Sequence, residues 1–190
     1  MLDLKSSTPP AWLDAVFADF DAFLVDHALC ERKASSMGMS LVAKYPDRVE
    51  LIDPLIEFAR EELEHFHLVY RLMAARGLRL ASDEKDPYVN RLRRLMRSGG
   101  DALLLDRLLV PGIVEARGCE RLRMVAGALE DPELQTFYMD ITRAESRHHA
   151  LFFRLARVYF DEERVAARAD ELLEAEAAIV AELPLRAAVH

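Results

Sequence analysis

The stretch Arg60-Glu61-Glu62-Leu63-Glu64-His65-Phe66 decides the fold, together with Arg143-Ala144-Glu145-Ser146-Arg147-His148-His149 near the end of the chain. Each stretch has a glutamate three residues before a histidine, and on a helix these two side chains lie one above the other on the same face. A carboxylate and an imidazole in this arrangement can bind one metal ion. Four-helix bundles that hold two iron or manganese ions use two such pairs and one further glutamate from each of the other two helices.

Length and composition are those of a globular protein. The 190 residues are 52% hydrophobic and 31% charged, and no apolar run approaches the roughly 20 residues that span a membrane. The first ten residues lack the apolar core of a secretory signal. Cys30 and Cys119 are too few for a disulfide scaffold. We therefore expect a single domain over residues 1–190, cytoplasmic, with no membrane contact.

The charge distribution is uneven. The net charge of −8 argues against a general nucleic-acid binder, whose phosphate contacts require a basic surface. Arginines nevertheless crowd the middle of the chain, so a local basic face is compatible with the composition. Acidic residues crowd the C-terminal stretch, namely Asp161, Glu162, Glu163, Asp170, Glu171, Glu174, Glu176 and Glu182.

Apolar periodicity predicts an all-α protein. Four long helices are expected, over about residues 11–45, 48–76, 101–129 and 132–160. Asp19 could interrupt the first, and Pro111 should kink or break the third near Leu108. The polar stretch 77–87 reads as a connection.

Two further helices complete the expected order. A short basic helix at about 88–97 lies in the long crossover, and an extra C-terminal helix at about 162–181 is expected at the periphery. This order is that of a ferritin-like four-helix bundle with its core at about residues 11–160.

The ligands of the first two helices can be selected by comparing how far each glutamate lies from the turn that joins these helices. Antiparallel helices joined by a turn meet at equal distances from that turn. Glu31 lies nearly as far before Pro46 in the sequence as Glu62 lies after it. Glu31 is therefore the partner of the first Glu-x-x-His pair.

The same rule applies to the third and fourth helices. Glu115 and Glu145 lie equally far from Glu130, one before this turn and one after it. Glu120 is the alternative, because Cys119-Glu120-Arg121 echoes Cys30-Glu31-Arg32. It lies nearer the turn, however, by a displacement of about 7.5 Å along the helix axis. Glu115 is the preferred ligand and Glu120 the runner-up.

The predicted site binds two metal ions. Four buried carboxylates without partners would each cost several kcal/mol, and two divalent cations supply the missing charge. Carboxylate and imidazole donors suit iron or manganese. The predicted ligands are Glu31, Glu62, His65, Glu115, Glu145 and His148.

Four blocks of the sequence resemble, in order and spacing, the motifs of the MiaE family of tRNA hydroxylases. The resemblance runs from about Trp12 to about Tyr159. The blocks are Asp26-His27-Ala28-Leu29-Cys30-Glu31-Arg32-Lys33-Ala34, Arg60-Glu61-Glu62-Leu63-Glu64-His65-Phe66, Glu115-Ala116-Arg117-Gly118-Cys119-Glu120-Arg121 and Glu145-Ser146-Arg147-His148.

The resemblance implies a non-haem di-iron monooxygenase. It would hydroxylate the isopentenyl group of 2-methylthio-isopentenyl-adenosine, next to the anticodon of certain tRNAs. The cofactors implied are two iron ions, with O2 as co-substrate and an external electron donor of the ferredoxin or reductase type. The candidate tRNA-binding residues are Arg91, Arg93, Arg94, Arg97, Arg117, Arg121 and Arg123.

The predicted ligand residues alone are also compatible with other functions. The same ligands fit a ferritin-like ferroxidase or iron-handling protein, which would assemble into a shell. They also fit another di-iron oxygenase, such as a quinone hydroxylase, and a metal-free helical adaptor is the third alternative. The sequence does not decide between a monomer and a small oligomer, and it identifies neither the electron donor nor the set of tRNAs.

Overall fold

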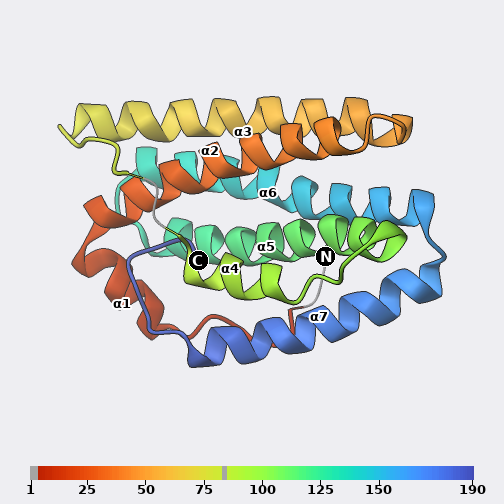
Figure 1. The fold of residues 1–190 in the computed structure, drawn as a ribbon. Helices are drawn as coiled ribbons and strands as arrows, with labels where there is room; N and C mark the ends of the chain where they lie inside the picture. Colours follow the sequence, from red (N-terminus) through yellow and green to blue (C-terminus); the bar gives the residue numbers. More distant parts are fainter. Residues whose placement is uncertain (1–3, 83–84) are drawn as a thin grey trace. The chain divides into compact units, whose positions relative to one another are not determined.

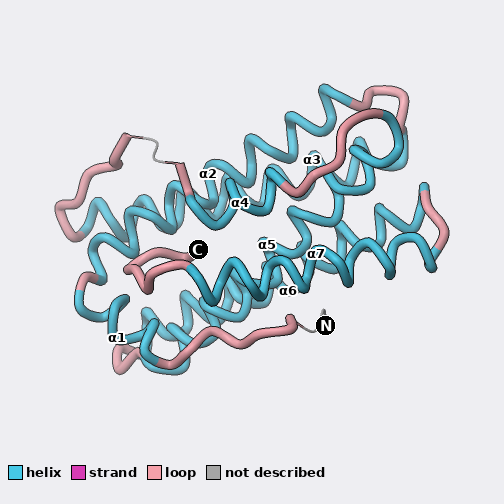
Figure 2. The backbone as a smooth tube through the Cα atoms, turned by 60° about the horizontal axis from the view of Figure 1, so that its bottom comes forward, coloured by secondary structure: helices cyan, strands magenta, loops and turns pink. Residues whose placement is uncertain are grey.

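The computed structural model describes residues 4–82 and 85–190, and within these ranges the chain forms seven α-helices and no strand (Figures 1 and 2). The all-α prediction is confirmed. The chain divides into two compact units. The first is built on the second and third helices, and the second on the last four helices with the N-terminal segment through Leu13 and with His190. None of the described helices is long and apolar enough to cross a membrane.

The predicted first helix is two helices, α1 (Ala11–Ala18) and α2 (Phe20–Lys44). The interruption falls at Asp19, whose carboxylate accepts a hydrogen bond from the Ala22 amide at 3.0 Å. An aspartate that caps a new helix in this way cannot also continue the old one. The interruption considered from the sequence is therefore present.

Helix α3 (Val49–Ala75) runs antiparallel beside α2 (Figure 1). The close approach depends on Gly38 of α2, where a Cβ atom would lie 2.9 Å from the Phe58 ring. Gly77 ends α3 with φ of 73°, and the Leu78 amide donates to the Met73 carbonyl at 3.0 Å. This is the glycine stop expected from the sequence. The sequence predicts that a connection follows this helix over residues 77–87. Residues 83–84 of this connection lie outside the described chain.

Helices α5 (Gly100–Ala128) and α6 (Pro132–Tyr159) form the second antiparallel pair. Asp131 caps α6 by accepting from the Glu133 and Leu134 amides, as predicted. Helix α5 continues through Pro111 without a break. Pro111 and its neighbours from Leu108 to Ile113 are buried, so packing outweighs the hydrogen bond that proline removes.

Helix α4 (Pro87–Arg94) lies in the crossover and begins at the cap Asp86. It ends three residues before the predicted Arg97. Helix α7 (Glu162–Glu182) lies against α4, α5 and α6 in the same unit (Figure 1). It buries the face that carries Val165, Leu172 and Ile179.

Candidate metal centre

The first unit brings together Glu31 of α2 with Glu62 and His65 of α3. One donor atom from each side chain lies within 4.8 Å of the other two. All three residues are buried, with exposures of 5%, 0% and 9%. The matched depths and the Glu-x-x-His spacing explain why they converge, because both helices present these positions to one another. We call this group the first triplet.

His27 supports the first triplet, and the sequence analysis missed this role. Its Nε2 lies 2.6 Å from Glu31 Oε1, one turn along the same helix, and His65 Nδ1 lies 3.7 Å from Glu31 Oε2. Burial alone would raise the pKa of Glu31, but the hydrogen bond and charge of His27 hold this pKa well below its ordinary value. The available signal was the spacing of four between His27 and Glu31 on an apolar face.

The second unit brings together Glu115 of α5 with Glu145 and His148 of α6. Their donor atoms also lie within 4.8 Å of one another, and His148 Nδ1 is 3.5 Å from Glu145 Oε2. The exposures are 9%, 3% and 3%. We call this group the second triplet. Each unit thus presents three of the six predicted ligand side chains.

Glu120, the runner-up ligand, has a different environment. Its carboxylate accepts hydrogen bonds from the Thr8 amide at 3.0 Å and from the Thr8 hydroxyl at 2.7 Å. It also pairs with Arg117. Both oxygens therefore bind the N-terminal segment and α5 itself, which favours Glu115 as the ligand of this helix.

The residues of each triplet fit a divalent metal ion. Two carboxylates and one imidazole form an oxygen-rich donor set with a charge of about −2, which one divalent cation neutralises. Such sets are typical of iron and manganese in helical bundles. The donor chemistry of each triplet therefore suits the binding of a divalent iron or manganese ion.

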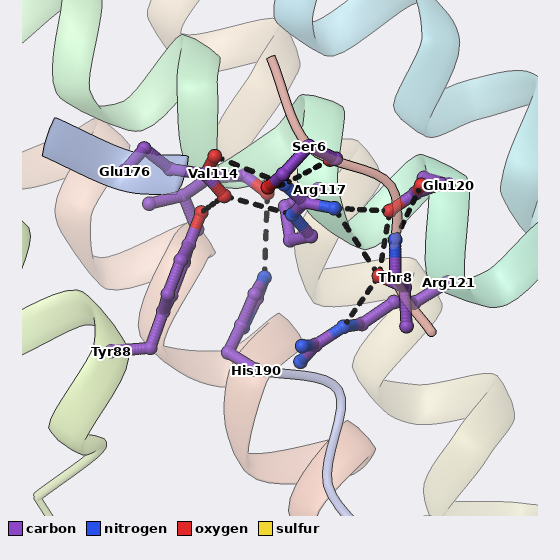
Figure 3. Close-up of polar contacts among 9 residues, drawn as sticks. All are labelled: Ser6, Thr8, Tyr88, Val114, Arg117, Glu120, Arg121, Glu176 and His190. Carbon is purple, nitrogen blue, oxygen red and sulfur yellow. Dashed lines mark hydrogen bonds and ion pairs between the residues drawn. The ribbon is translucent and has the colours of Figure 1, made fainter. Parts of the chain in front are cut away.

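Arg117 lies at the centre of a buried polar network in the second unit (Figure 3). Its Nε and Nη2 donate to the two carboxylate oxygens of Glu176 on α7 at 2.8 and 2.9 Å. Nη2 also donates to the Ser6 carbonyl at 2.9 Å, and Nη1 donates to Thr8 Oγ1 at 3.2 Å. The Tyr88 hydroxyl of α4 donates to Glu176 at 2.9 Å. The network joins α4, α5, α7 and the N-terminal segment.

Two of the candidate tRNA-binding arginines are buried, contrary to expectation. Arg117 is 0% exposed, and although burial alone would lower its pKa, the hydrogen bonds and charge of Glu176 raise this pKa. Arg121 is 7% exposed, and its guanidinium lies 5.2 Å from the centroid of the Trp12 ring. Guanidinium groups enclosed in this way do not present a surface to phosphate, so their assignment to a tRNA surface is wrong.

Glu176 is one of the acidic residues that crowd the C-terminal stretch of the sequence. It is fully buried. The signal that could have located it is its position on the apolar stripe of α7, four residues after Leu172 and three before Ile179.

The other candidate arginines differ in what they contact. Arg93 and Arg94 of α4 and Arg123 of α5 are exposed. Arg91 pairs with Glu182, and Arg97 donates to buried Asp106.

Nearly the whole chain matches one protein family. The family model described as tRNA-(MS[2]IO[6]A)-hydroxylase (MiaE) matches residues 2–190. The tRNA 2-(methylsulfanyl)-N(6)-isopentenyladenosine(37) hydroxylase of Pseudomonas putida is 41% identical over 172 residues, covering 90% of this chain and 83% of that protein. The hydroxylase of the same name from Salmonella typhimurium is 27% identical over 226 residues, covering 93% and 83%.

A solved structure extends the comparison to the fold. It is the protein with aldehyde deformylating oxygenase activity from Synechococcus, with a TM-score of 0.92 and 34% identity, covering 97% of this chain and 92% of that one. The helical order is that of the ferritin-like oxygenases, as predicted. The chain belongs to the MiaE family of tRNA hydroxylases.

Proposed function

We propose that this protein is a di-iron monooxygenase that hydroxylates the isopentenyl group of 2-methylthio-isopentenyl-adenosine at position 37 of tRNA. The observation that carries the proposal is the match of the MiaE family over residues 2–190, supported by the 41% identical hydroxylase. The fold alone does not select this substrate, because the structural relative from Synechococcus is named for a different oxygenase activity.

The two triplets would hold two iron ions in this proposal. When bound, the irons supply the activation of O2 that is needed to insert oxygen at an allylic carbon, where no acidic proton or leaving group is available. The three side chains of the first triplet and the three of the second would anchor the metals. His27 would orient Glu31, because its ring nitrogen lies 2.6 Å from one carboxylate oxygen.

The proposal also includes partners. The reaction consumes two electrons, so an electron-transfer protein of the ferredoxin or reductase type is required. The substrate is tRNA, and an enzyme that modifies tRNA works in the cytoplasm.

Arg93 and Arg94 are the best candidates for contact with the tRNA backbone. Both are exposed on α4, and neither has an ion-pair partner within the described chain, whereas Arg91 and Arg97 are held by acids. A guanidinium that is exposed and not neutralised can replace counterions on phosphate. Arg123 is exposed as well and remains a weaker candidate, because its Nη2 lies 3.9 Å from Cys119 Sγ.

The tRNA surface can be tested by salt dependence. The variant Arg93→Gln/Arg94→Gln should weaken tRNA binding and lower the slope of log affinity against log salt by roughly 1.4 to 1.8, for two phosphate contacts. The control Lys44→Gln/Arg79→Gln removes the same charge from exposed positions elsewhere. Equal effects of the two double variants would contradict the assignment of α4.

The reaction itself is tested with reduced, iron-loaded protein, prenylated tRNA and O2, followed by mass analysis of the nucleosides. The proposal predicts that the prenylated nucleoside gains one oxygen atom, and that tRNA without the prenyl group does not react. If iron is oxidised and the nucleoside mass is unchanged, the result supports the ferroxidase alternative and contradicts the hydroxylase proposal.

A further inference from the structure

The outer face of α6 carries a line of arginines. Between residues 143 and 159, every exposed charged side chain is an arginine, namely Arg143, Arg147, Arg154 and Arg157. Their spacings of four, seven and three residues place all of them within about 40° of one line along the helix. Exposed Ala150 lies on the same line, so no bulky side chain interrupts it. We call these four side chains the arginine stripe.

The arginine stripe is positive on a protein whose net charge is −8. Its two end members pair with acids of the chain, Arg143 with Asp140 and Arg157 with Glu162. Both pairs are exposed to solvent, where ion pairs are weak. Arg154 forms no ion pair within the described chain. The stripe therefore retains charge for a partner that binds from outside.

The neighbouring helix in the same unit has the opposite charge. The exposed acids of α7 are Glu162, Glu163, Asp170, Glu171, Glu174 and Glu182. A negatively charged protein is attracted to α6 and repelled by α7, so the two helices together orient its approach. The charge pattern of this unit thus fits an acidic partner.

The arginine stripe lies on the side of α6 opposite the second triplet. At about 100° per residue, Glu145 and His148 point about 170° away from the stripe. Both side chains are buried. A molecule on the stripe is therefore separated from these two side chains by one helix, which is about 10 to 12 Å thick.

This position suits an electron carrier better than a nucleic acid. The prenyl group of a tRNA has to reach the metal centre itself, and the body of α6 lies between the stripe and the second triplet. An electron needs no opening, because it can cross the thickness of one packed helix. The two requirements differ, and the stripe meets that of the electron carrier.

We propose that the arginine stripe is the docking surface of the electron donor, an acidic one-electron carrier of the ferredoxin class. This inference rests on the proposed function, in which each hydroxyl group formed consumes one O2, two electrons and two protons and releases one water. Such a carrier docks twice per turnover, and each encounter oxidises one reduced carrier and delivers one electron. The stripe extends over about 21 Å, which suits the small, short-lived interfaces of electron-transfer partners.

Binding of a carrier protein tests the surface. The probe is an acidic plant-type [2Fe–2S] ferredoxin, which the iron-loaded wild type should bind with an affinity that falls as salt rises. Arg147→Gln/Arg154→Gln should lower this affinity on the order of tenfold at low salt, with unchanged helix content and iron content. The control Lys44→Gln/Arg79→Gln removes the same charge from exposed positions elsewhere. A wild type that does not bind the ferredoxin, or equal effects of the two double variants, would overturn the proposal.

The rate of reduction separates docking from hydroxylation. Without O2 or tRNA, the iron-loaded Arg147→Gln/Arg154→Gln variant should oxidise reduced ferredoxin more slowly than the wild type does. Dithionite is a small reductant that needs no docking surface, so it should reduce both proteins at the same rate. Equal rates with ferredoxin would overturn the docking proposal.

Two further outcomes distinguish this inference from the proposed function. If dithionite-reduced wild type leaves the prenylated nucleoside unchanged, the proposed function fails, whereas slower oxidation of ferredoxin by the double variant would still support the docking surface. If the double variant loses tRNA binding and keeps ferredoxin binding, the stripe contacts nucleic acid and the docking proposal is rejected.

Discussion

The two helix pairs carry the same ligand pattern but support it in different ways. In the α2–α3 pair, the predicted ligand Glu31 is contacted directly by His27 from its own helix, at 2.6 Å. In the α5–α6 pair, the helix that carries Glu115 is held two residues later by Arg117, whose guanidinium binds Glu176 of α7. In the α2–α3 pair the contact orients the Glu31 side chain, whereas in the α5–α6 pair the ion pair holds the helix backbone near Glu115.

This difference predicts different consequences of mutation. A hydrogen bond to one ligand oxygen determines where that oxygen points, so its loss should affect metal affinity before stability. The Arg117–Glu176 ion pair is the centre of a buried network that joins three helices and the N-terminal segment, so its loss should affect the stability of the fold first. The predictions below compare the two pairs, from the largest expected effect to the smallest.

The ion pair of the second unit should give the largest change in stability. Arg117→Met leaves Glu176 buried without its bidentate partner, which typically costs about 3 to 5 kcal/mol of unfolding free energy. For a chain of this length the melting temperature should fall by roughly 2 to 4 °C per kcal/mol.

The matched control is the double variant Arg117→Met/Glu176→Met, which removes both charges. Replacing both members by apolar residues of similar volume is often close to neutral, so much of the lost stability should return. If the double variant is as unstable as the single one, the contacts of Arg117 with Ser6 and Thr8 carry the stability instead of the ion pair.

Substitution of the glycine at the close helix–helix contact should destabilise both helix pairs to a similar extent. A Cβ atom at Gly38 would lie 2.9 Å from the Phe58 ring, and one at Gly112 would lie 2.9 Å from the Phe153 ring. Alanine at either site should cost about 1 to 3 kcal/mol, as overpacking does. Gly127→Ala is the control, because no atom within 4 Å opposes its Cβ. Denaturant unfolding that ranks all three glycines alike would show that the contacts are not limiting.

Substitution of His27 should change the metal affinity of the site more than the stability of the fold. His27→Ala removes the hydrogen-bond partner of Glu31, so the iron affinity measured by chelator competition should fall by about 10- to 100-fold. His67→Ala changes an exposed histidine on α3 and should have no effect. Unchanged affinity in His27→Ala would mean that Glu31 is oriented by other contacts.

Helix caps should give the smallest change. Asp19→Ala removes the cap of α2, and Asp131→Ala removes that of α6, each at a cost of about 1 kcal/mol. Arg48 precedes α3 and makes no capping bond with its side chain, so Arg48→Ala should be near neutral. Thermal unfolding would contradict this ranking if Arg48→Ala were as destabilising as the two aspartate variants.

Much of the candidate site follows from the sequence because the predicted ligand positions obey helix geometry. The spacing of three within each Glu-x-x-His pair and the matched depths of Glu31 and Glu62 are properties of antiparallel helices, and both can be counted along the chain. The interruption at Asp19 and the cap at Asp131 follow from local chemistry in the same way.

The remaining features depend on tertiary contacts that spacing does not encode. Arg117 and Arg121 appear on a helix among other arginines, and only the packing of α7 and the N-terminal segment encloses them. The continuity of α5 through Pro111 likewise depends on burial of the residues around it, which offsets an unfavourable local preference. Charge patterns that look like surface in sequence can therefore form the interior.

The central proposal is that the first triplet and the second triplet each bind iron. The most direct test is the iron content per chain after anaerobic reconstitution of the wild type, of Glu62→Gln/His65→Gln and of Glu145→Gln/His148→Gln. The account predicts about two irons in the wild type and one or fewer in each double variant. A wild type without iron, or a content of two that survives the loss of either triplet, would contradict it.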